Sequence, residues 1–149
     1  MPYPYQGPKG DSSARFPHSR LTRRQIILIV DDDPHIVEVI AALLQMKLAV
    51  SIYQENSVLR AIRTLRKSKA RILISDIAMP ELNGLTFCEL VSRERLTEHI
   101  LMMSGAVEPR DQQLAVSCGA HALIDKTDVD LLVRTVTEWL HEAGREELS

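Results

Sequence analysis

The chain has 149 residues, of which 45% are hydrophobic and 26% are charged, a balance that is typical of one soluble globular domain. Its longest aliphatic run, residues 26–30, is too short to cross a bilayer. Its two cysteines are too few for a disulfide framework. These properties exclude a disulfide-stabilised secreted protein, and we expect a cytoplasmic protein without membrane insertion.

The first 24 residues differ in composition from the rest of the chain. They are rich in proline, glycine and serine and carry five basic residues against Asp11 alone, although the whole chain has a formal net charge of −2. A basic arm can bind nucleic acid or anionic lipid, but this one lacks interleaved aromatic residues. We therefore expect residues 1–24 to be a disordered N-terminal extension; a start codon assigned too far upstream would give the same composition.

From residue 25 onward, apolar runs alternate with helical patterns. Residues 25–30 (QIILIV) are continuously aliphatic, which is typical of a strand buried on both faces. Residues 33–47 repeat apolar side chains at helical spacing, with Pro34 suited to the first turn and Asp33 to the N-cap. Residues 49–54 (AVSIYQ) alternate between apolar and polar, which predicts an edge strand with one wet face.

The second part of the chain continues this alternation. A helix is expected after Asn56 or Ser57, with an apolar stripe that begins at Leu59. Residues 70–76 predict a central strand, and residues 77–84 (IAMPELNG) a turn-rich loop. The remaining predicted elements are a helix over 85–96, a strand over 99–105, a helix over 109–118, a strand over 120–125 and a helix over 128–144.

Five strand–helix units with short connections imply a parallel sheet covered by helices on both faces. Five units are too few for a closed barrel, and a second strand at the edge favours the order 2-1-3-4-5. We therefore predict an α/β, flavodoxin-like (βα)5 three-layer sandwich with a parallel five-stranded sheet in that order. The expected domain covers residues 25–145, and residues 146–149 are expected to form a short tail.

Polar residues gather where the predicted strands end: Asp31, Asp32, Asp76 and Ser104, followed by Lys126 after the last strand. The carboxyl ends of parallel strands share one edge of the sheet, where ligands bind. A single aspartate at a strand end is more often a helix cap, but three carboxylates at one edge repel unless a cation neutralises them. Mg²⁺ prefers oxygen ligands, so the strand ends predict a site for Mg²⁺ or Mn²⁺.

Four segments carry a family resemblance: ILIVDDDP, ILISDIAMPELNG with its D-x-x-M-P turn, ILMMSGA, and GAHALIDK. Each motif is weak alone, but the four occur in order, and Lys126 follows Gly119 by seven residues, as in the family. Over residues 25–145 the chain resembles the receiver domain of two-component response regulators.

The resemblance implies a role for each strand-end residue. Asp76 would be the phosphoacceptor, taking a phosphoryl group from a sensor histidine kinase or a histidine phosphotransfer protein. Asp31, Asp32, Asp76 and the backbone carbonyl of Ala78 would bind the metal ion, Ser104 would hydrogen-bond the phosphoryl group, and Lys126 would pair with it. Such a protein catalyses its own phosphorylation but turns over no separate substrate, so it is not an enzyme in the usual sense.

The resemblance also implies partners. We expect a stand-alone receiver that signals by contact with a downstream protein, with no direct nucleic-acid binding. A homodimer could form through the helices over residues 109–118 and 128–144. One alternative is a pseudo-receiver, an interaction module that takes no phosphate. An aspartate-nucleophile phosphatase is a second alternative, but its D-x-D-x-[TV] motif is absent from both DDDPH and DIAMP.

The sequence departs from the family pattern at four positions. Thr127 stands where a proline usually follows the lysine, and Leu123 stands where an aromatic residue usually rotates with the hydroxyl. Coupling should therefore run through the loop and helix that follow Ser104. Ala78 and Ala106 hold positions that tune phosphoryl lifetime, and neither side chain can orient a water molecule. Slow decay of the phosphoryl group, or dependence on an external phosphatase, is the expected consequence.

Overall fold

The computed structural model describes residues 25–80 and 82–148, and the expected disordered extension lies outside these residues. Within them, five β-strands alternate with five α-helices, as expected, with most boundaries shifted by two residues or fewer. In chain order the elements are β1 (Gln25–Val30), α1 (Pro34–Lys47), β2 (Val50–Glu55), α2 (Val58–Lys67), β3 (Ala70–Asp76), α3 (Gly84–Arg93), β4 (Thr97–Ser104), α4 (Pro109–Ser117), β5 (Ala122–Asp125) and α5 (Val129–Leu148).

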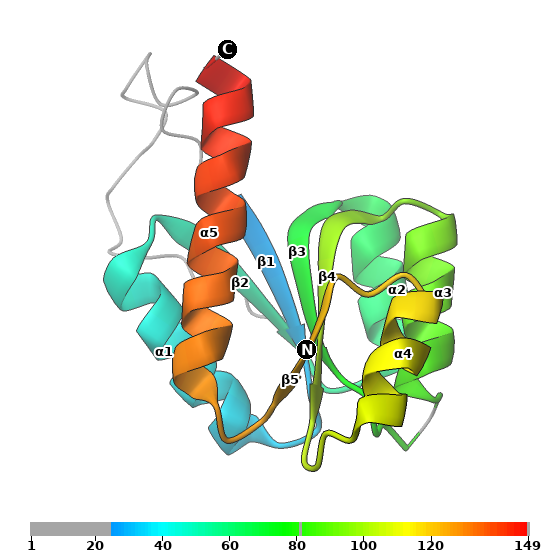
Figure 1. Cartoon of the computed structure of the whole chain (residues 1–149). Helices are drawn as coiled ribbons and strands as arrows, with labels where there is room; N and C mark the ends of the chain where they lie inside the picture. Colours follow the sequence, from blue (N-terminus) through cyan, green and yellow to red (C-terminus); the bar gives the residue numbers. More distant parts are fainter. Residues whose placement is uncertain (1–24, 81, 149) are drawn as a thin grey trace.

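All strand pairs in the sheet are parallel, and the strand order is β2-β1-β3-β4-β5. Helices α1 and α5 cover one face of the sheet, and α2, α3 and α4 cover the other (Figure 1). The predicted flavodoxin-like three-layer sandwich is therefore confirmed. Within the described ranges, none of the helices combines the length and the apolar character that crossing a bilayer requires.

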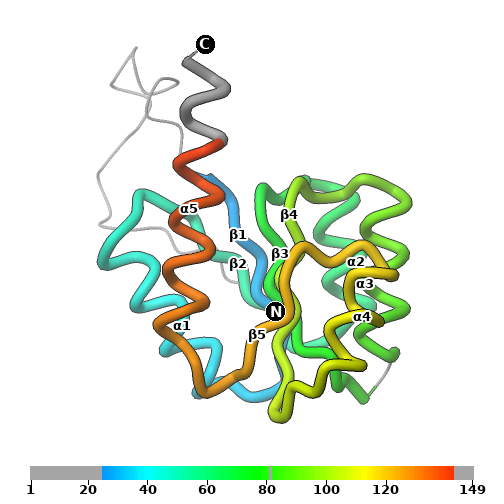
Figure 2. The backbone as a smooth tube through the Cα atoms, in the orientation of Figure 1, coloured from blue at the N-terminus to red at the C-terminus, as the bar shows by residue number. Residues whose placement is uncertain are grey.

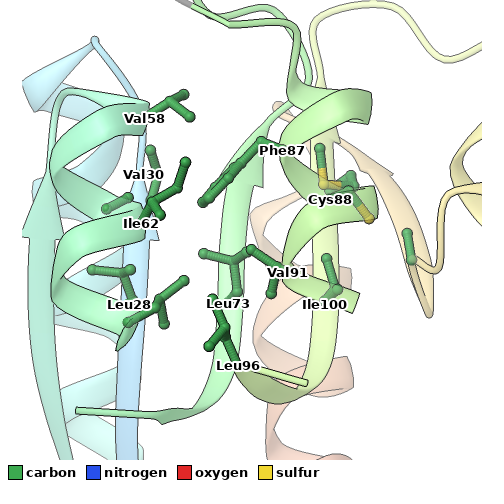
Figure 3. Close-up of a cluster of buried hydrophobic side chains, with 14 of the residues drawn as sticks. Leu28, Val30, Val58, Ile62, Leu73, Phe87, Cys88, Val91, Leu96 and Ile100 are labelled. Atoms are coloured by element: carbon green, nitrogen blue, oxygen red, sulfur yellow. The ribbon is translucent and has the colours of Figure 1, made fainter. Parts of the chain in front are cut away.

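Strand β1 is buried on both faces because successive side chains point to opposite sides of a sheet. Leu28 and Val30 pack toward Val58 and Ile62 of α2, in a core that also contains Phe87 (Figure 3). Ile27 and Ile29 face the opposite core beneath α1 and α5, and both are fully buried. Burying each such side chain stabilises the fold by about 1.5 to 3 kcal/mol, which explains the continuous aliphatic run.

Helix α1 begins as the sequence predicts. The Asp33 side chain accepts a hydrogen bond from the backbone N–H of His35 at 3.0 Å, and Pro34 occupies the first turn. Ser57, one of the two candidates, caps α2 by accepting a hydrogen bond from the backbone N–H of Arg60 at 3.3 Å. The closing helix is longer than expected, since α5 continues to Leu148 and residues 146–148 are helical.

Two details differ from the expected pattern. Leu59 is 59% exposed, because the buried stripe of α2 consists of Val58, Ala61, Ile62 and Leu65 instead. At the end of edge strand β2, Glu55 is buried, and its carboxylate accepts a hydrogen bond from the hydroxyl of Thr64 at 2.7 Å. Helix α2 therefore covers the polar face of β2 at the carboxyl end of the strand.

The loops that leave the strands gather at one end of the sheet, and the loops that enter β3 and β4 lie at the opposite end (Figure 2). This separation follows from the parallel arrangement of the strands. Each end of the sheet therefore carries its own set of loop residues.

Candidate functional site at the carboxyl ends of the strands

Three carboxylates converge at the carboxyl ends of β1 and β3. Asp31 and Asp32 follow β1 directly, and Asp76 is the last residue of β3. Ligand atoms of these three side chains lie within 4.8 Å of one another. Asp31 and Asp76 are buried, whereas Asp32 is exposed. The structure therefore brings together the acidic residues that the sequence separates by more than 40 positions.

Lys126 lies between the two buried carboxylates. Its Nζ is 2.7 Å from Oδ2 of Asp76 and 2.9 Å from Oδ2 of Asp31. The backbone N–H of Lys126 donates to the carbonyl of Ser104 at 2.9 Å, which fixes the start of this loop against β4. One ammonium group thus bridges the ends of β1 and β3 from the loop after β5.

The charges in this cluster do not balance, because three carboxylates face one ammonium group. Burial raises the pKa of Asp31, and the neighbouring Asp76 charge acts in the same direction, although Lys126 and a backbone N–H oppose them. Burial by itself lowers the pKa of Lys126, but its contacts with Asp76 and Asp31 outweigh burial and raise that pKa. The cluster holds excess negative charge that a cation would relieve.

The donor set of the cluster fits a hard divalent cation. Oδ2 of Asp31 is buried and, apart from its ion pair with Lys126, receives no hydrogen bond from the described residues. Exposed Asp32 opens the cluster toward solvent, from which an ion and its water molecules can enter. Carboxylate oxygens with room for water are the ligands that Mg²⁺ requires.

The loop after β3 is held tightly against the end of that strand. The backbone N–H of Ala78 donates to Oδ1 of Asp76 at 3.0 Å. Gly84 closes the loop by donating its N–H to the carbonyl of Ile77 at 3.0 Å. A Cβ atom at Gly84 would lie 2.6 Å from the Asp76 carbonyl oxygen and from Ile77. Gly84 was expected only as a turn residue; its close approach to the backbone of Asp76 could not be found from the sequence.

Ser104 ends β4, the strand beside β3, and its side chain is turned toward its own loop. Its Oγ donates to the carbonyl of Ala106 at 3.0 Å and accepts from the N–H of Ala106 at 3.3 Å. The hydroxyl therefore closes a small turn at the start of the β4–α4 loop. It lies in the strand next to Asp76, and breaking these two hydrogen bonds would free it.

Two of the four positions that depart from the family pattern, Thr127 and Leu123, have well-defined contacts. The N–H and hydroxyl of Thr127 both donate to Asp125, at 2.8 and 2.6 Å, and these hydrogen bonds lower the pKa of Asp125. No peptide bond in the described ranges is cis. Leu123 is 6% exposed and packs into the core beneath α2, α3 and α4.

Known proteins match this chain in sequence and in fold. The model of the response regulator receiver domain family matches residues 27–137. The alkaline phosphatase synthesis transcriptional regulatory protein PhoP of Bacillus subtilis is 30% identical over 103 residues, which are 67% of this chain and 41% of PhoP. The DNA-binding response regulator MtrA of Mycolicibacterium smegmatis is 30% identical over 106 residues, 70% of this chain and 45% of MtrA.

This chain spans less than half the length of those two relatives. A solved CheY-like receiver domain protein from Methanospirillum hungatei superimposes with a TM-score of 0.74 at 22% identity, covering 83% of this chain and 98% of that one. The fold and the family match together place the chain in a single class. It belongs to the response regulator receiver domain family of two-component systems.

Membership of this family defines the general role. Receiver domains are signalling modules that work through phosphorylation, interact with histidine kinases and downstream effectors, and bind Mg²⁺ in an acidic pocket. They are not enzymes that turn over a separate substrate. This chain has an acidic cluster, formed by Asp31, Asp32 and Asp76.

Proposed function

We propose that this protein is a phosphorylation-dependent switch in which Asp76 accepts a phosphoryl group from a histidine kinase or a histidine phosphotransfer protein. The supporting observation is the position of Lys126, whose Nζ touches both buried carboxylates within 2.9 Å. This contact assembles the ends of β1, β3 and β5 into one site. Residues 25–145 would be the receiver domain.

Asp76 is suited to act as the nucleophile. Lys126 donates a hydrogen bond to Oδ2 of Asp76, which favours the ionised carboxylate. In the transfer, a carboxylate oxygen of Asp76 would form a bond to phosphorus as the phosphorus–nitrogen bond of a phosphohistidine breaks. The electron pair of that bond would remain on the imidazole. Phosphoryl transfer of this kind depends mainly on positioning and charge neutralisation.

The residues that would hold Mg²⁺ are the carboxylates of Asp31, Asp32 and Asp76 and the backbone carbonyl of Ala78. When bound, the ion would neutralise the negative charge of the phosphoryl oxygens beside these carboxylates. Lys126 and the N–H of Ala78, which already donate to Asp76, would orient the acceptor oxygen. Mn²⁺ has similar ligand preferences.

The switch would begin at Ser104. A phosphoryl group on Asp76 adds strong acceptor oxygens, and the Ser104 hydroxyl would leave the carbonyl of Ala106 to donate to one of them. That exchange would release the turn at the start of the β4–α4 loop. Helix α4 begins at the end of this loop and would move with it. The Gln112 side chain of α4 donates to the carbonyl of Leu123 at 3.1 Å, so this movement would reach β5. Leu123 itself is buried in the core, which favours this route over rotation of a side chain.

The output surface would be the α4–β5–α5 side of the molecule, where Leu114 is 44% and Val116 is 65% exposed. A downstream protein, or a second copy of the chain, would bind there. Both Leu114 and Val116 lie on α4, and Cys118 at the end of this helix is half-buried. Exposed apolar residues on α4 are consistent with a contact surface.

The test is phosphorylation of purified protein with Mg²⁺ and radiolabelled acetyl phosphate. Wild type should gain acid-stable, hydroxylamine-labile label, and D76N should gain none. D33N, which removes a carboxylate outside the acidic cluster, is the control that should still be labelled. Decay of the label tests the expected slow hydrolysis at Ala78 and Ala106. A wild-type protein that takes no label and binds no beryllofluoride would instead be a pseudo-receiver.

A further inference from the structure

A groove of about 540 Å³ opens at the amino ends of β1, β3 and β4. This is the end of the sheet opposite the acidic cluster (Figure 1). Three basic residues, Lys69, Arg71 and Arg95, line the groove together with one acidic residue, Glu98, and the apolar Ile26. Asp76 lies six positions after Ala70 in β3, so the two ends lie about 20 Å apart.

Some of the basic residues near the groove have an ordinary explanation. Arg66 and Lys67 lie in the last turn of α2, and Arg93 lies in the last turn of α3. Cations at these positions stabilise helix carboxyl ends, and Arg66 also pairs with Glu94 at 2.7 Å. Lys69 and Arg95 lie two residues beyond the last residues of α2 and α3, and Arg71 lies in β3, so none of these three is in the last turn of a helix.

Arg71 is built into the wall of the groove. Its side chain is only 16% exposed. It donates to the side-chain oxygen of Gln25 at 2.6 Å and forms an ion pair with Glu98. Lys69 and Arg95 are exposed and, within residues 25–80 and 82–148, have no acidic partner. The groove therefore carries two positive charges that the described acidic residues do not neutralise.

Arg95 has an unusual backbone conformation. Its φ of 53° lies in the left-handed region, and it is the only non-glycine residue in the described ranges with a positive φ. The N–H of Arg95 donates to Ser92, and the N–H of Leu96 donates to Val91, which closes the end of α3. Glycine is favoured at such a position, and a side chain there stores backbone strain. An arginine at this strained position indicates a role for its side chain.

We propose that this groove binds an acidic, Asp- and Glu-rich segment of a partner protein. Guanidinium and ammonium groups form strong charge-assisted hydrogen bonds with carboxylates, and Glu98 on Arg71 shows that geometry within the groove. Residues 1–24 of this chain carry five basic residues and one acidic residue. Their charge has the same sign as the groove, so they are not the complementary segment.

The charges around the groove favour a peptide over a phosphate-rich ligand. Both α2 and α3 direct their carboxyl ends to this side of the sheet, and the partial negative charge of helix carboxyl ends disfavours a dense anion. Glu98 disfavours it further. A peptide presents single carboxylates several ångströms apart, which can reach Lys69 and Arg95 separately. The site lies at the opposite end of the sheet from the acceptor, so this inference does not depend on phosphorylation.

The experiment measures binding of a fluorescein-labelled alternating Asp–Glu decapeptide by fluorescence anisotropy, with an Asn–Gln decapeptide as the neutral control. The K69Q/R95Q variant of the full chain should bind the acidic peptide about tenfold more weakly. The matched control is R60Q/R63Q, which removes the same charge from the exposed face of α2 outside the groove and should change affinity less than about twofold.

R95G separates binding from folding. Glycine suits the positive φ of residue 95, so R95G should unfold at the same or a higher urea concentration while binding the peptide more weakly. Equal weakening by both double variants would reduce the binding to general electrostatics and overturn the proposal. Tighter binding of phosphatidylserine vesicles or tripolyphosphate than of the peptide, lost in K69Q/R95Q, would also overturn it and would assign the groove to a phosphate-bearing ligand.

Discussion

The two ends of the sheet carry opposite charge patterns. At the carboxyl end, three carboxylates surround one ammonium group, that of Lys126. At the amino end, three basic side chains line a groove with one carboxylate, that of Glu98. A parallel sheet makes this separation possible because all strands start at one end and finish at the other. The acidic end holds a compact buried cluster, whereas most of the basic end is exposed.

This difference in burial indicates what each end can do. Buried Asp31 and Asp76 interact strongly with Lys126 and with any cation, because screening by water is weak inside the protein. Exposed Lys69 and Arg95 interact weakly with single charges and gain affinity only when several contacts form together. The acidic end is therefore suited to chemistry with a small ion and a phosphoryl group, and the basic end to an extended partner.

The largest expected effect comes from removing the bridging cation at the acidic end. K126M leaves two buried carboxylates without a counter-charge, so the free energy of unfolding without divalent ions should fall by about 3 kcal/mol. Mg²⁺ should restore part of the loss, because it would occupy the same negative cluster. Urea unfolding with EDTA and with Mg²⁺ measures both effects. The control K67M, at an exposed position of α2, should change little; an equally large loss there would show that Lys126 has no special role.

Substitution of Gly84 tests how closely the loop after β3 must approach the backbone of Asp76. In G84A the new Cβ would overlap the backbone of Asp76 and Ile77, which should cost about 1 to 3 kcal/mol of stability and slow the labelling of Asp76. In the control G105A, also in a site loop, the new Cβ would meet no atom within 4 Å. Denaturant titration and labelling rates should separate the two variants, and unchanged labelling in G84A would contradict this role.

Asp31 provides a test of opposite sign. Since burial raises its pKa, its ionised form opposes folding, and its contribution to stability is lost as the pH rises through that pKa. At neutral pH without Mg²⁺, D31N should therefore be more stable than wild type, by about 1 kcal/mol. It should also lose the rise in melting temperature that Mg²⁺ gives. The control is D33N, because asparagine caps a helix as well as aspartate does; a similar gain in D33N would contradict the prediction.

The smallest expected effect is at His121, which directly precedes β5 at the amino end of the sheet. Burial, and then the nearby His99, lower the pKa of His121, whose Nδ1 accepts the N–H of Ile100 at 3.1 Å. The ordinary pKa of histidine, 6.5, applies in the unfolded chain. Because the pKa is lower in the folded protein, the neutral imidazole stabilises the fold above pH 6.5, and this stability is lost as the pH falls below 6.5 toward the folded-state pKa.

The variant H121Q should remove part of the stability loss between pH 7 and pH 5. His121 is only partly buried and much of the residue remains exposed, so screening by solvent limits this effect to about 0.5 kcal/mol or less. Thermal unfolding at both pH values measures it. H141Q, at an exposed position of α5, should leave the pH dependence unchanged. An identical pH profile for H121Q and wild type would contradict the assignment.

Much of the fold follows from local patterns in the sequence. The aliphatic runs at residues 25–30 and 70–76 predict buried strands, and Asp33-Pro34 predicts the start of α1; the structure confirms both. The pattern is less reliable on amphipathic helices. The sequence places Leu59 in the apolar stripe of its helix, but Leu59 is exposed, because a shift of one residue turns a helical side chain by about 100°.

The acidic cluster was predictable because its residues follow predicted strands, so that Asp31, Asp32, Asp76 and Lys126 could be named from their positions at the strand ends. The basic groove had no such signal. Arg71 is the second residue of β3, whereas Arg95 precedes β4, and no motif joins them. Residues 60–71 are rich in arginine and lysine. The sequence alone does not show which of these cations lie at a helix end and which line the groove.

The sequence by itself determined the order of strands and helices, the family, and the residues at the carboxyl ends of the strands, because hydrophobic period and short motifs are local properties. Only the tertiary structure decided which charges meet. In the folded chain, Lys126 contacts both Asp31 and Asp76, and the Ser104 hydroxyl bonds to Ala106. Gly84 packs closely against the backbone of Asp76, and Arg71 and Arg95 line one groove. Some of these contacts join distant segments of the chain, and the others depend on backbone angles. The spacing of residues along the chain reveals neither kind.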